Sequence, residues 1–494
     1  MVTSSLSEMA RLLRLVAVSI LLITCSRGML LAQGRPTFSF ATYPTGRSPL
    51  VIQIVDINHD GIPDLVTANW AYNTISVLLG NGNGTFQLPT VLSVPGSPES
   101  VAVGDFNGDG ELDLVAPLST NGCILLNNGD GTFQNPLTYP TGSIPSSIAA
   151  GDFDGDGKLD IAVANFGSNS VSILRGNGDG TFQAQVMFPV ATEPTSVVAA
   201  DLNHDGRLDL AVSTLSSDAG NDYAGAVSVL ISVGDGSFLP RVDYRADFWT
   251  TQVVVRDLNH DGHPDLAAVN ECGIYPNCIA GGAAPGTVSI FLGNGDGTYA
   301  PQVTYIAGAR PMSIAATDFN GDAKVDLLVD NWIQSSVSML FGLGDGTFGP
   351  HIPVGVPSLG QFATAGDVNG DRTGSSDIVT DGNIAVNVLL NNAGTKITLT
   401  SSPNPAPLGT PVTLSAQVAS SVTGQPQPTG PVKFVSGGTV LGTAELTGGV
   451  ATFVLNDLPA GSTPIRAAYR GSALFNPHLS MPILQVVVAA GVDQ

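Results

Sequence analysis

The sequence predicts an all-β chain: a seven-bladed β-propeller followed by an immunoglobulin-like β-sandwich. Three observations lead to this expectation. A nine-residue acidic loop recurs seven times at intervals of 47 to 61 residues, a Gly-rich turn follows each loop, and the acidic loops stop before residue 396. With 59 Gly and 33 Pro in 494 residues, the composition favours short strands and tight turns over helices.

Each acidic loop places oxygen-bearing side chains at its positions 1, 3, 5 and 9. The third copy is DFDGDGKLD, beginning at Asp152, and the Gly at position 6 allows a sharp turn. This spacing wraps the chain around one hard cation, and position 7 offers a backbone carbonyl as a further ligand. An Asx-rich turn without metal is the alternative, but such a turn needs only one or two Asp or Asn residues. The pattern therefore predicts five to seven structural Ca²⁺ ions.

The candidate calcium ligands are the residues at positions 1, 3, 5, 7 and 9 of each loop, with position 7 acting through its backbone. The five intact loops contribute Asp56, Asn58, Asp60, Ile62, Asp64, Asp105, Asn107, Asp109, Glu111, Asp113, Asp152, Asp154, Asp156, Lys158, Asp160, Asp201, Asn203, Asp205, Arg207, Asp209, Asp257, Asn259, Asp261, His263 and Asp265. The two looser copies contribute Asp318, Asn320, Asp322, Lys324, Asp326, Asp367, Asn369, Asp371 and Asp377. Ala323 replaces the usual Gly in the sixth loop, and two extra residues precede Asp377 in the seventh, so these two loops are the weaker candidates.

The acidic loops differ from EF-hands. An EF-hand needs a bidentate Glu at position 12 and a helix on each side. Position 12 here is Thr, Ala, Val or Ile, and the flanking segments are short β-type runs. We therefore expect each loop to join two antiparallel strands.

A second signature, of the type NGDGTF, follows each acidic loop and predicts a tight hairpin. One repeat then contains four strands, A to D, with the acidic loop between A and B and the Gly-rich turn between C and D. A four-stranded meander repeated seven times is typical of a β-propeller. The segment PTFSFATYPTG, beginning at Pro36, looks like a strand D without a blade of its own. We expect this segment to complete the seventh blade and close the ring.

The loops and hairpins resemble FG-GAP/VCBS repeats, the calcium-bearing blades of integrin α-chain propellers and of many secreted bacterial proteins. The resemblance covers residues 36–395, and it implies that each Ca²⁺ is structural and is held in the A–B hairpin. Residues 396–494 contain SSPNP, LPAG and AAYRGSALF and about seven short alternating strands. They resemble a bacterial Ig-like domain, a module that usually acts as a spacer or an adhesive unit.

The net charge of −23 is explained by the acidic loops. Without residues 1–32 the chain has 15 basic and 40 acidic residues, and 22 of the acidic residues occupy ligand positions. Seven bound Ca²⁺ would change the resulting charge of −25 to −11, so most of the acidity is metal-site charge. The scarcity of Lys and Arg argues against nucleic acid as a partner.

Residues 1–32 are typical of an export signal. Arg11 and Arg14 precede an apolar run, Leu15 to Ile23, that is too short to span a bilayer. We expect a secreted or cell-surface protein without a transmembrane segment, monomeric in solution. A lipidated Cys25 is the alternative mode of attachment.

The chain after residue 32 keeps three cysteines. Cys272 and Cys278 lie six residues apart in an insert that contains Pro and Gly, so we expect a local disulfide in an oxidising compartment. Cys123 lies within an apolar strand and is expected to be a buried thiol.

Aromatic residues point to a ligand face. Because chain direction alternates, the A–B and C–D turns share one face of the ring, and the B–C and D–A loops share the other. All three tryptophans fall on this second face: Trp70 and Trp332 in B–C loops and Trp249 in a D–A loop, with Phe166 equivalent to Trp70. Exposed aromatics on a rigid ring would suit a glycan or an extracellular protein ligand, whereas packing between blades is the alternative.

Catalysis is the weaker expectation. The sequence contains neither HExxH nor GxSxG, and nearly all of its carboxylate pairs belong to the predicted metal loops. We therefore predict a secreted calcium-binding propeller that acts as a non-catalytic ligand-binding or adhesion protein. A polysaccharide-acting lyase or hydrolase, and a structural spacer in a surface assembly, are the alternatives.

Overall fold

The computed structural model describes residues 38–129, 131–216, 224–273, 285–320, 322–369, 376–391, 395–420, 427–436, 439–469, 478–480 and 482–488. Contacts divide the chain into two compact units, Phe38–Asn391 and a second unit that contains the residues from Asn392 onward. The predicted export segment, residues 1–32, lies outside the described residues. No described helix is long and apolar enough to span a membrane.

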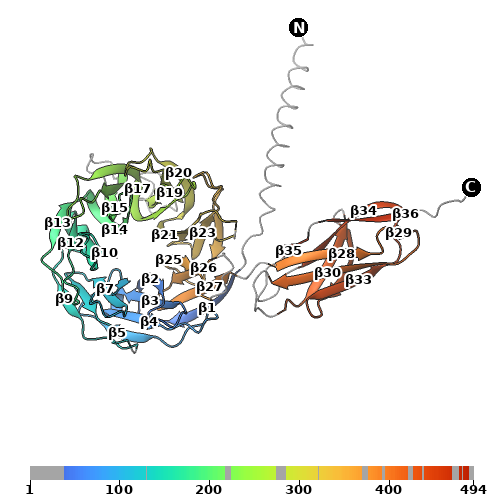
Figure 1. Cartoon of the computed structure of the whole chain (residues 1–494), viewed down its shortest axis with the longest axis horizontal. Coiled ribbons are helices and arrows are strands. Elements are labelled where there is room, and N and C mark those ends of the chain that lie inside the picture. Colours follow the sequence, from blue (N-terminus) through green and yellow to red (C-terminus); the bar gives the residue numbers. More distant parts are fainter. Residues whose placement is uncertain are drawn as a thin grey trace, which may run out of the picture. The chain divides into compact units, whose positions relative to one another are not determined.

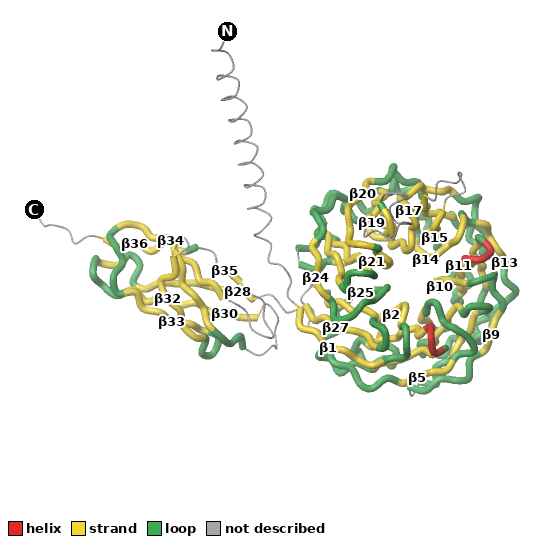
Figure 2. The backbone as a smooth tube through the Cα atoms, turned by 180° about the vertical axis from the view of Figure 1, so that it is seen from behind, coloured by secondary structure: helices red, strands yellow, loops and turns green. Residues whose placement is uncertain are grey.

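The first unit is a ring of antiparallel β-meanders, one per acidic loop (Figure 1). Blade 1 consists of β2 (Pro49–Val55), β3 (Asp64–Asn69), β4 (Thr74–Leu78) and β5 (Thr90–Ser93). Blade 2 consists of β6 (Ala102–Gly104), β7 (Asp113–Pro117), β8 (Gly122–Leu125) and β9 (Leu137–Tyr139). Blade 3 consists of β10 (Pro145–Gly151), β11 (Asp160–Asn165), β12 (Ser170–Leu174) and β13 (Val186–Pro189). The short 3₁₀-helices η2 (Trp70–Tyr72) and η3 (Phe166–Ser168) form the B–C loops of blades 1 and 3 (Figure 2).

The remaining blades follow the same order around the ring. Blades 4 and 5 contain β14 (Thr192–Ala200), β15 (Asp209–Ser216), β16 (Ala224–Leu230), β17 (Val242–Arg256), β18 (Asp265–Cys272), β19 (Pro285–Phe291) and β20 (Val303–Ala309). Blade 6 contains β21 (Pro311–Thr317), β22 (Asp326–Asn331), β23 (Ser336–Leu340) and β24 (Ile352–Gly355). Blade 7 contains β25 (Ala363–Gly366), β26 (Asp377–Asp381), β27 (Ala385–Asn391) and β1 (Phe38–Pro44).

Strand β1 closes the ring, as the sequence predicts. It pairs antiparallel with β27, in a register that runs from Phe38 opposite Asn391 to Pro44 opposite Ala385. The first described strand of the chain is thereby the outermost strand of the last blade. This closure protects the sheet edge that an open array of blades would leave exposed.

Blades 4 and 5 depart from the expected separate meanders, because they share one strand. β17 is the outer strand of blade 4 and continues as the inner strand of blade 5, so the two blades form a seven-stranded sheet. Trp249, expected in a D–A loop, therefore lies within a strand. The chain turns there without a loop, because Trp249 has a left-handed φ of 57° and a register shift follows between Thr250 and Gln252.

The core of the ring consists of apolar layers between neighbouring blades. In β22, Leu327 and Val329 pack against residues of blade 5, whereas Leu328 packs against residues of blade 7. Strand B is therefore buried on both faces, which explains why these strands are continuous apolar runs instead of alternating ones.

The second unit is a two-sheet sandwich, in agreement with the predicted Ig-like fold. One sheet contains β28 (Thr395–Ser402), β30 (Val412–Ser420) and β33 (Val450–Leu455). The other contains β29 (Ala406–Pro407), β36 (Ile483–Val488), β34 (Gly461–Tyr469), β31 (Pro431–Ser436) and β32 (Thr439–Glu445), and β35 (His478–Leu479) pairs with β34. Leu414, Phe434 and Tyr469 lie in the single core between the two sheets.

Candidate functional site

The acidic loops are wrapped by hydrogen bonds from their own backbone. In the first loop, Asp56 Oδ1 accepts the amide of Asp60 at 3.0 Å, and Asp56 Oδ2 accepts the amide of Gly61 at 2.8 Å. The amide of Asp60 also donates to Asn58 Oδ1 at 3.1 Å, and Asp60 Oδ1 accepts the amide of Ile62 at 2.8 Å. These bonds hold the side chains of positions 1, 3 and 5 around the same turn. The other intact loops repeat them.

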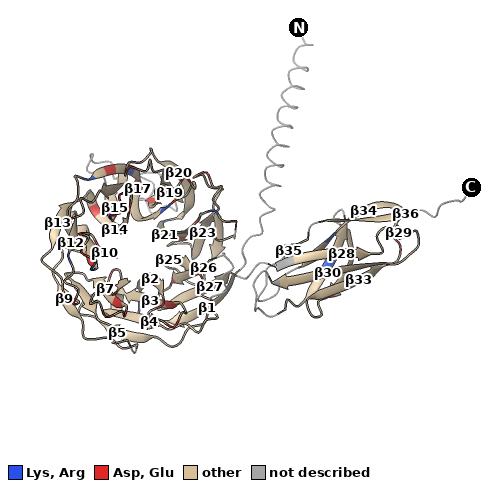
Figure 3. Cartoon of the chain, viewed as in Figure 1, with Lys and Arg blue, Asp and Glu red and all other residues tan. Residues whose placement is uncertain are grey.

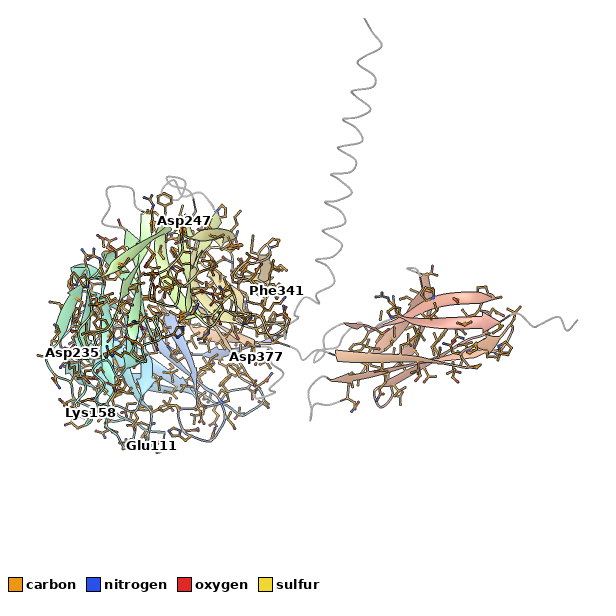
Figure 4. All side chains as sticks on the ribbon, turned by 45° about the horizontal axis from the view of Figure 1, so that its top comes forward. Glu111, Lys158, Asp235, Asp247, Phe341 and Asp377 are labelled. Atoms are coloured by element: carbon orange, nitrogen blue, oxygen red, sulfur yellow. The ribbon has the colours of Figure 1, made fainter. Side chains whose placement is uncertain are left out.

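The third loop carries the densest group of carboxylates. Asp152, Asp154 and Asp156 each offer one oxygen, and these oxygens lie within 4.8 Å of one another. Ca²⁺ binds oxygens at about 2.3–2.6 Å, so one ion between them could reach all three. Lys158, labelled in Figure 4, lies next to this group, with its ammonium 3.2 Å from Asp156 Oδ2.

The Asp at position 9 has a structural role that the sequence did not indicate. Asp64 is fully buried, its Oδ2 accepts the amide of Ile57 at 3.0 Å, and its Oδ1 accepts the amide of Gly80 at 2.7 Å. The carboxylate thus joins the acidic loop to the start of the Gly-rich turn. The same two bonds are made by Asp113, Asp160, Asp209, Asp265, Asp326 and Asp377.

Burial makes this position electrostatically costly. Burial, together with the negative charges of Asp60 and Asp56, raises the pKa of Asp64 to about 6, against the lowering effect of the two amide bonds. The pKa of Asp326 is raised to about 7 for the same reasons. Each carboxylate oxygen keeps a second lone pair after accepting one N–H. The donor set of the loop therefore fits a divalent cation, whose charge would offset this repulsion.

The sixth loop keeps the wrapped conformation despite its Ala. Ala323 has a left-handed φ of 64°, and its amide donates to Asp318 Oδ2 at 2.7 Å, just as Gly61 donates to Asp56. A side chain in this conformation costs about 1–2 kcal/mol, which the sixth loop tolerates. In the seventh loop, residues 370–375, including Asp371, lie outside the described residues.

The cysteines are distributed as follows. Cys272, at the buried end of β18, is disulfide-bonded, while its predicted partner Cys278 lies outside the described residues. Cys123 is a free and fully buried thiol, as predicted, and burial raises its pKa to about 12. Such a thiol is unreactive at neutral pH.

Two of the predicted ligand-face tryptophans are linked to acidic side chains, Trp70 directly and Trp332 through Arg310. The indole N–H of Trp70, whose residue is 45% exposed, donates to Glu99 Oε1 at 2.8 Å. Arg310 stacks on the ring of Trp332, with 4.5 Å between the guanidinium carbon and the ring centroid, and forms an ion pair with Glu271. Trp249 and Phe166 are half-buried.

Glu99 and Glu271 border the same central cavity, of about 450 Å³. All seven blades line it through the beginning of their innermost segments, which surround the middle of the ring in Figure 1. Figure 3 shows how sparsely Lys and Arg are distributed over the ring. A cavity of this size is in the range of small-ligand sites. Sequence reasoning missed it, because its lining assembles residues from every repeat.

Polar side chains of the inner segments also connect neighbouring blades. Ser147 Oγ accepts the amide of Val197 at 3.3 Å, and Ser313 Oγ accepts the amide of Ala363 at 2.8 Å. Gln252 uses its Oε1 in the same way. Ser147 and Ser313 each end a P-x-S triplet at the start of its segment, but Ser100 and Ser196 end such triplets without making this bond.

Blades 6 and 7 contain two further buried acids, Asp330 and Asp381. Asp330 Oδ2 has no hydrogen-bond partner among the described residues, and burial raises the pKa of Asp330 to about 7. Asp381 Oδ1 accepts the amides of Gln361 and Phe362 at 2.8 and 2.9 Å. Burial raises the pKa of Asp381, with a further contribution from Asp330. Both acids occupy the fifth position of strand B, where blades 1 and 3 have Ala.

Comparisons with protein families agree with this architecture. The model of the FG-GAP-like repeat matches residues 56–116, 119–163, 152–212 and 277–329. The model of the bacterial Ig-like domain (group 3) matches residues 399–489. The protein is thus a repeat propeller joined to an Ig-like sandwich. More specifically, it is an FG-GAP repeat protein with a group 3 bacterial Ig-like domain. This domain content is typical of extracellular, non-catalytic binding and adhesion proteins.

Three of the solved structures that match this chain have low identity and TM-scores below 0.5. A lectin of Agrocybe aegerita, described as recognising non-reducing terminal N-acetylglucosamine, is 17% identical with a TM-score of 0.42, covering 65% of this chain and 90% of its own. BBS1N in its complex with ARL6DN is 11% identical with a TM-score of 0.48, covering 72% and 98%. A protein of unknown function from Desulfotomaculum acetoxidans is 15% identical with a TM-score of 0.42, covering 62% and 89%. No curated protein matches the sequence.

Proposed function

We propose that this protein is a secreted, calcium-stabilised propeller that binds a ligand on the face of its B–C and D–A loops. The ligand is a glycan or an extracellular protein, and binding serves recognition or adhesion without catalysis. The observation that carries this proposal is the central cavity, which all seven blades line and which Glu99, bonded to Trp70, and Glu271, paired with Arg310, border.

Calcium is proposed as the stabilising ion because of the donor chemistry of the loops. Carboxylate and amide oxygens at positions 1, 3 and 5 surround one turn, and hard oxygen ligands are those that Ca²⁺ prefers. When bound, the ion would supply charge neutralisation at these loops. With the ion bound, the loops would fix strands A and B relative to each other. This would also maintain the positions of the B–C and D–A loops on the opposite face.

Ligand binding is tested by screening the intact protein in about 1 mM Ca²⁺ against glycan and extracellular-protein arrays, with and without chelator. We expect a saturable ligand whose binding is lost when the propeller is destabilised by chelation. The screen is repeated with a Glu99→Gln variant, which alters the cavity, and with Glu445→Gln, which changes an exposed residue of the Ig-like unit. Absence of any ligand, or equal binding by a chelator-unfolded propeller, would contradict the proposal.

The enzymatic alternative gains no support from the cavity. Of its two carboxylates, Glu271 is paired with Arg310, whereas Glu99 accepts a hydrogen bond from Trp70. A glycosidase needs one carboxylic acid and one free carboxylate flanking the bond that is cleaved. Turnover of a polysaccharide that is abolished by Glu99→Gln would nevertheless favour the enzyme over the binding protein.

A further inference from the structure

The central cavity has two chemically different sides. Blades 6, 7 and 1, which are neighbours across the closure of the ring, contribute mostly apolar side chains: Met312, Phe362, Leu50 and Val51. Blades 2 to 5 contribute mainly Ser, Thr, Gln and Glu side chains. A ligand that fills the cavity must therefore combine an apolar part with a hydrogen-bonding part.

Two serine hydroxyls on the polar side of the cavity lack protein partners. Ser100 and Ser196 line the cavity and are only 6% and 8% exposed. Within the part of the chain that the structure describes, neither side chain makes a hydrogen bond, in contrast to Ser147 and Ser313. These hydroxyls are therefore available for recognition.

The charge of the cavity is negative. None of its described lining residues is Lys, Arg or His. Arg310 neutralises Glu271, whereas the partner of Glu99 is the neutral indole of Trp70. Glu99 therefore gives the cavity an uncompensated negative charge, which disfavours phosphates, sulfates and acidic sugars and favours a cation.

The geometry of Glu99 also selects among cations. A guanidinium binds a carboxylate best through both oxygens at once, but Glu99 Oε1 already accepts the indole N–H of Trp70. Oε2 makes no hydrogen bond within the described residues. One free oxygen, with the Ser100 hydroxyl lining the same cavity, suits an ammonium group, a compact charge with three donors.

We propose that the cavity binds the side chain of a lysine from an extracellular protein or peptide. This inference rests on the proposed ligand-binding function and specifies its ligand. The ammonium donates to Glu99 Oε2 and to the hydroxyl of Ser100. The four-carbon stem packs against Leu50 and Val51 of the neighbouring blade, as lysine stems commonly do along apolar surface.

The test uses the full chain in calcium and a short blocked peptide with one central lysine. Isothermal titration compares this peptide with its Nε-acetyl-lysine and norleucine counterparts, and with N-acetylglucosamine. We expect saturable binding of the lysine peptide, at least tenfold weaker binding of both neutral peptides, and weaker binding at high salt. The Glu99→Gln variant keeps an oxygen that can accept the Trp70 hydrogen bond but removes the charge, so it should lose at least tenfold in affinity. Glu445→Gln should bind like the wild type.

Trp70→Phe tests whether the indole positions Glu99. The substitution removes the N–H donor and replaces the indole by a smaller aromatic ring at a residue that is 45% exposed, so we expect a few-fold loss for the lysine peptide and little change in melting temperature. An arginine peptide should gain relative to the lysine peptide, because both oxygens of Glu99 become free. A structural role alone would not produce this change in preference.

The outcomes separate the inference from the proposed function. Equal binding of lysine and acetyl-lysine peptides, or undiminished binding by Glu99→Gln, would overturn the lysine site. If the arrays still yield a ligand in that case, the binding function stands and only its specificity is wrong. If neither arrays nor peptides yield a ligand, both fail.

Discussion

The two units of the chain bury their apolar residues in different ways. The Ig-like unit has one apolar core between two sheets, built around Phe434 and Tyr469. The propeller divides its apolar residues into separate layers between blades and links strands A and B of each blade through an acidic loop. We therefore expect the stability of the propeller to depend on its acidic loops, and the stability of the Ig-like unit to depend on its apolar core. Loss of cations should therefore affect the first unit and spare the second.

The largest expected effect comes from chelation. At about 1 mM Ca²⁺ and a dissociation constant of about 10⁻⁴ M, each site adds about 1.4 kcal/mol, so five to seven sites add about 7–10 kcal/mol at most. For a unit of this size, that sum corresponds to about 10 °C in melting temperature. Calorimetry of the whole chain in excess EGTA should show the propeller transition lowered and the Ig-like transition in place. Two unmoved transitions would remove the contrast between the units.

A substitution in the Ig-like core should have the opposite effect to chelation, because it should destabilise only the Ig-like unit. Phe434 is fully buried and stacks on Phe453, with ring centroids 5.9 Å apart. Phe434→Ala should cost about 3–5 kcal/mol through lost burial and a cavity. The same calorimetric scan should show the Ig-like transition lowered and the calcium-dependent propeller transition unchanged. A shift of both transitions would mean that the two units unfold together.

Asp330, buried in β22 of blade 6, should make the stability of the propeller depend on pH. Burial raises the pKa of Asp330 from 3.8 to about 7. Between these two pH values, Asp330 is protonated in the folded state and ionised in the unfolded state. Stability from this group is fully present below pH 4 and is lost as pH rises through 7. Asp330→Asn should remove this dependence and stabilise the propeller at pH 8 by at most about 4 kcal/mol. Denaturant titrations at pH 5 and 8 measure the effect, with the exposed Asp457→Asn as control. An equal effect of Asp330→Asn at both pH values would argue against a buried, protonated Asp330.

Single-loop variants should show a graded series, with smaller effects. Asp152→Ala removes the first ligand of the loop with four ligand carboxylates, together with three amide hydrogen bonds. We expect a loss of about 2–3 kcal/mol, from one calcium site and these bonds. Asp371→Ala, in the looser seventh loop, should cost less than about 1 kcal/mol. Equal losses in calorimetry would contradict the ranking of the loops.

The sequence predicted those parts of the fold that each repeat encodes by itself. The acidic loop and the Gly-rich turn mark the two hairpins of every blade, and the segment from Pro36 reveals the closing strand because it resembles the outer strands of other blades. What it could not predict depends on residues that are distant in the sequence. The shared strand β17 joins two repeats, the two hydrogen bonds of Asp64 join its acidic loop to the turn of the same blade, and Asp330 Oδ2 is buried without a partner among the described residues.

The same distinction applies to the candidate sites. The metal ligands were predicted because their spacing lies within nine residues, and the structure brings positions 1, 3 and 5 together. The cavity was not predicted, since Glu99 and Glu271 are far apart in the sequence and line the same cavity only in the folded ring. The tryptophans were predicted as ligand contacts, but in the structure Trp70 donates to Glu99, and Trp332 contacts Arg310, which pairs with Glu271. Their direct contact with a ligand stays a prediction.

The central claim is that calcium occupies the acidic loops, and counting ions on the intact chain tests it most directly. Native mass spectrometry of the protein in calcium should show five to seven bound ions per chain, which EGTA removes. Asp152→Ala should lower the count by one, whereas the control Asp457→Asn should leave it unchanged. A chain that carries no ion, or only one, at millimolar calcium would contradict the account.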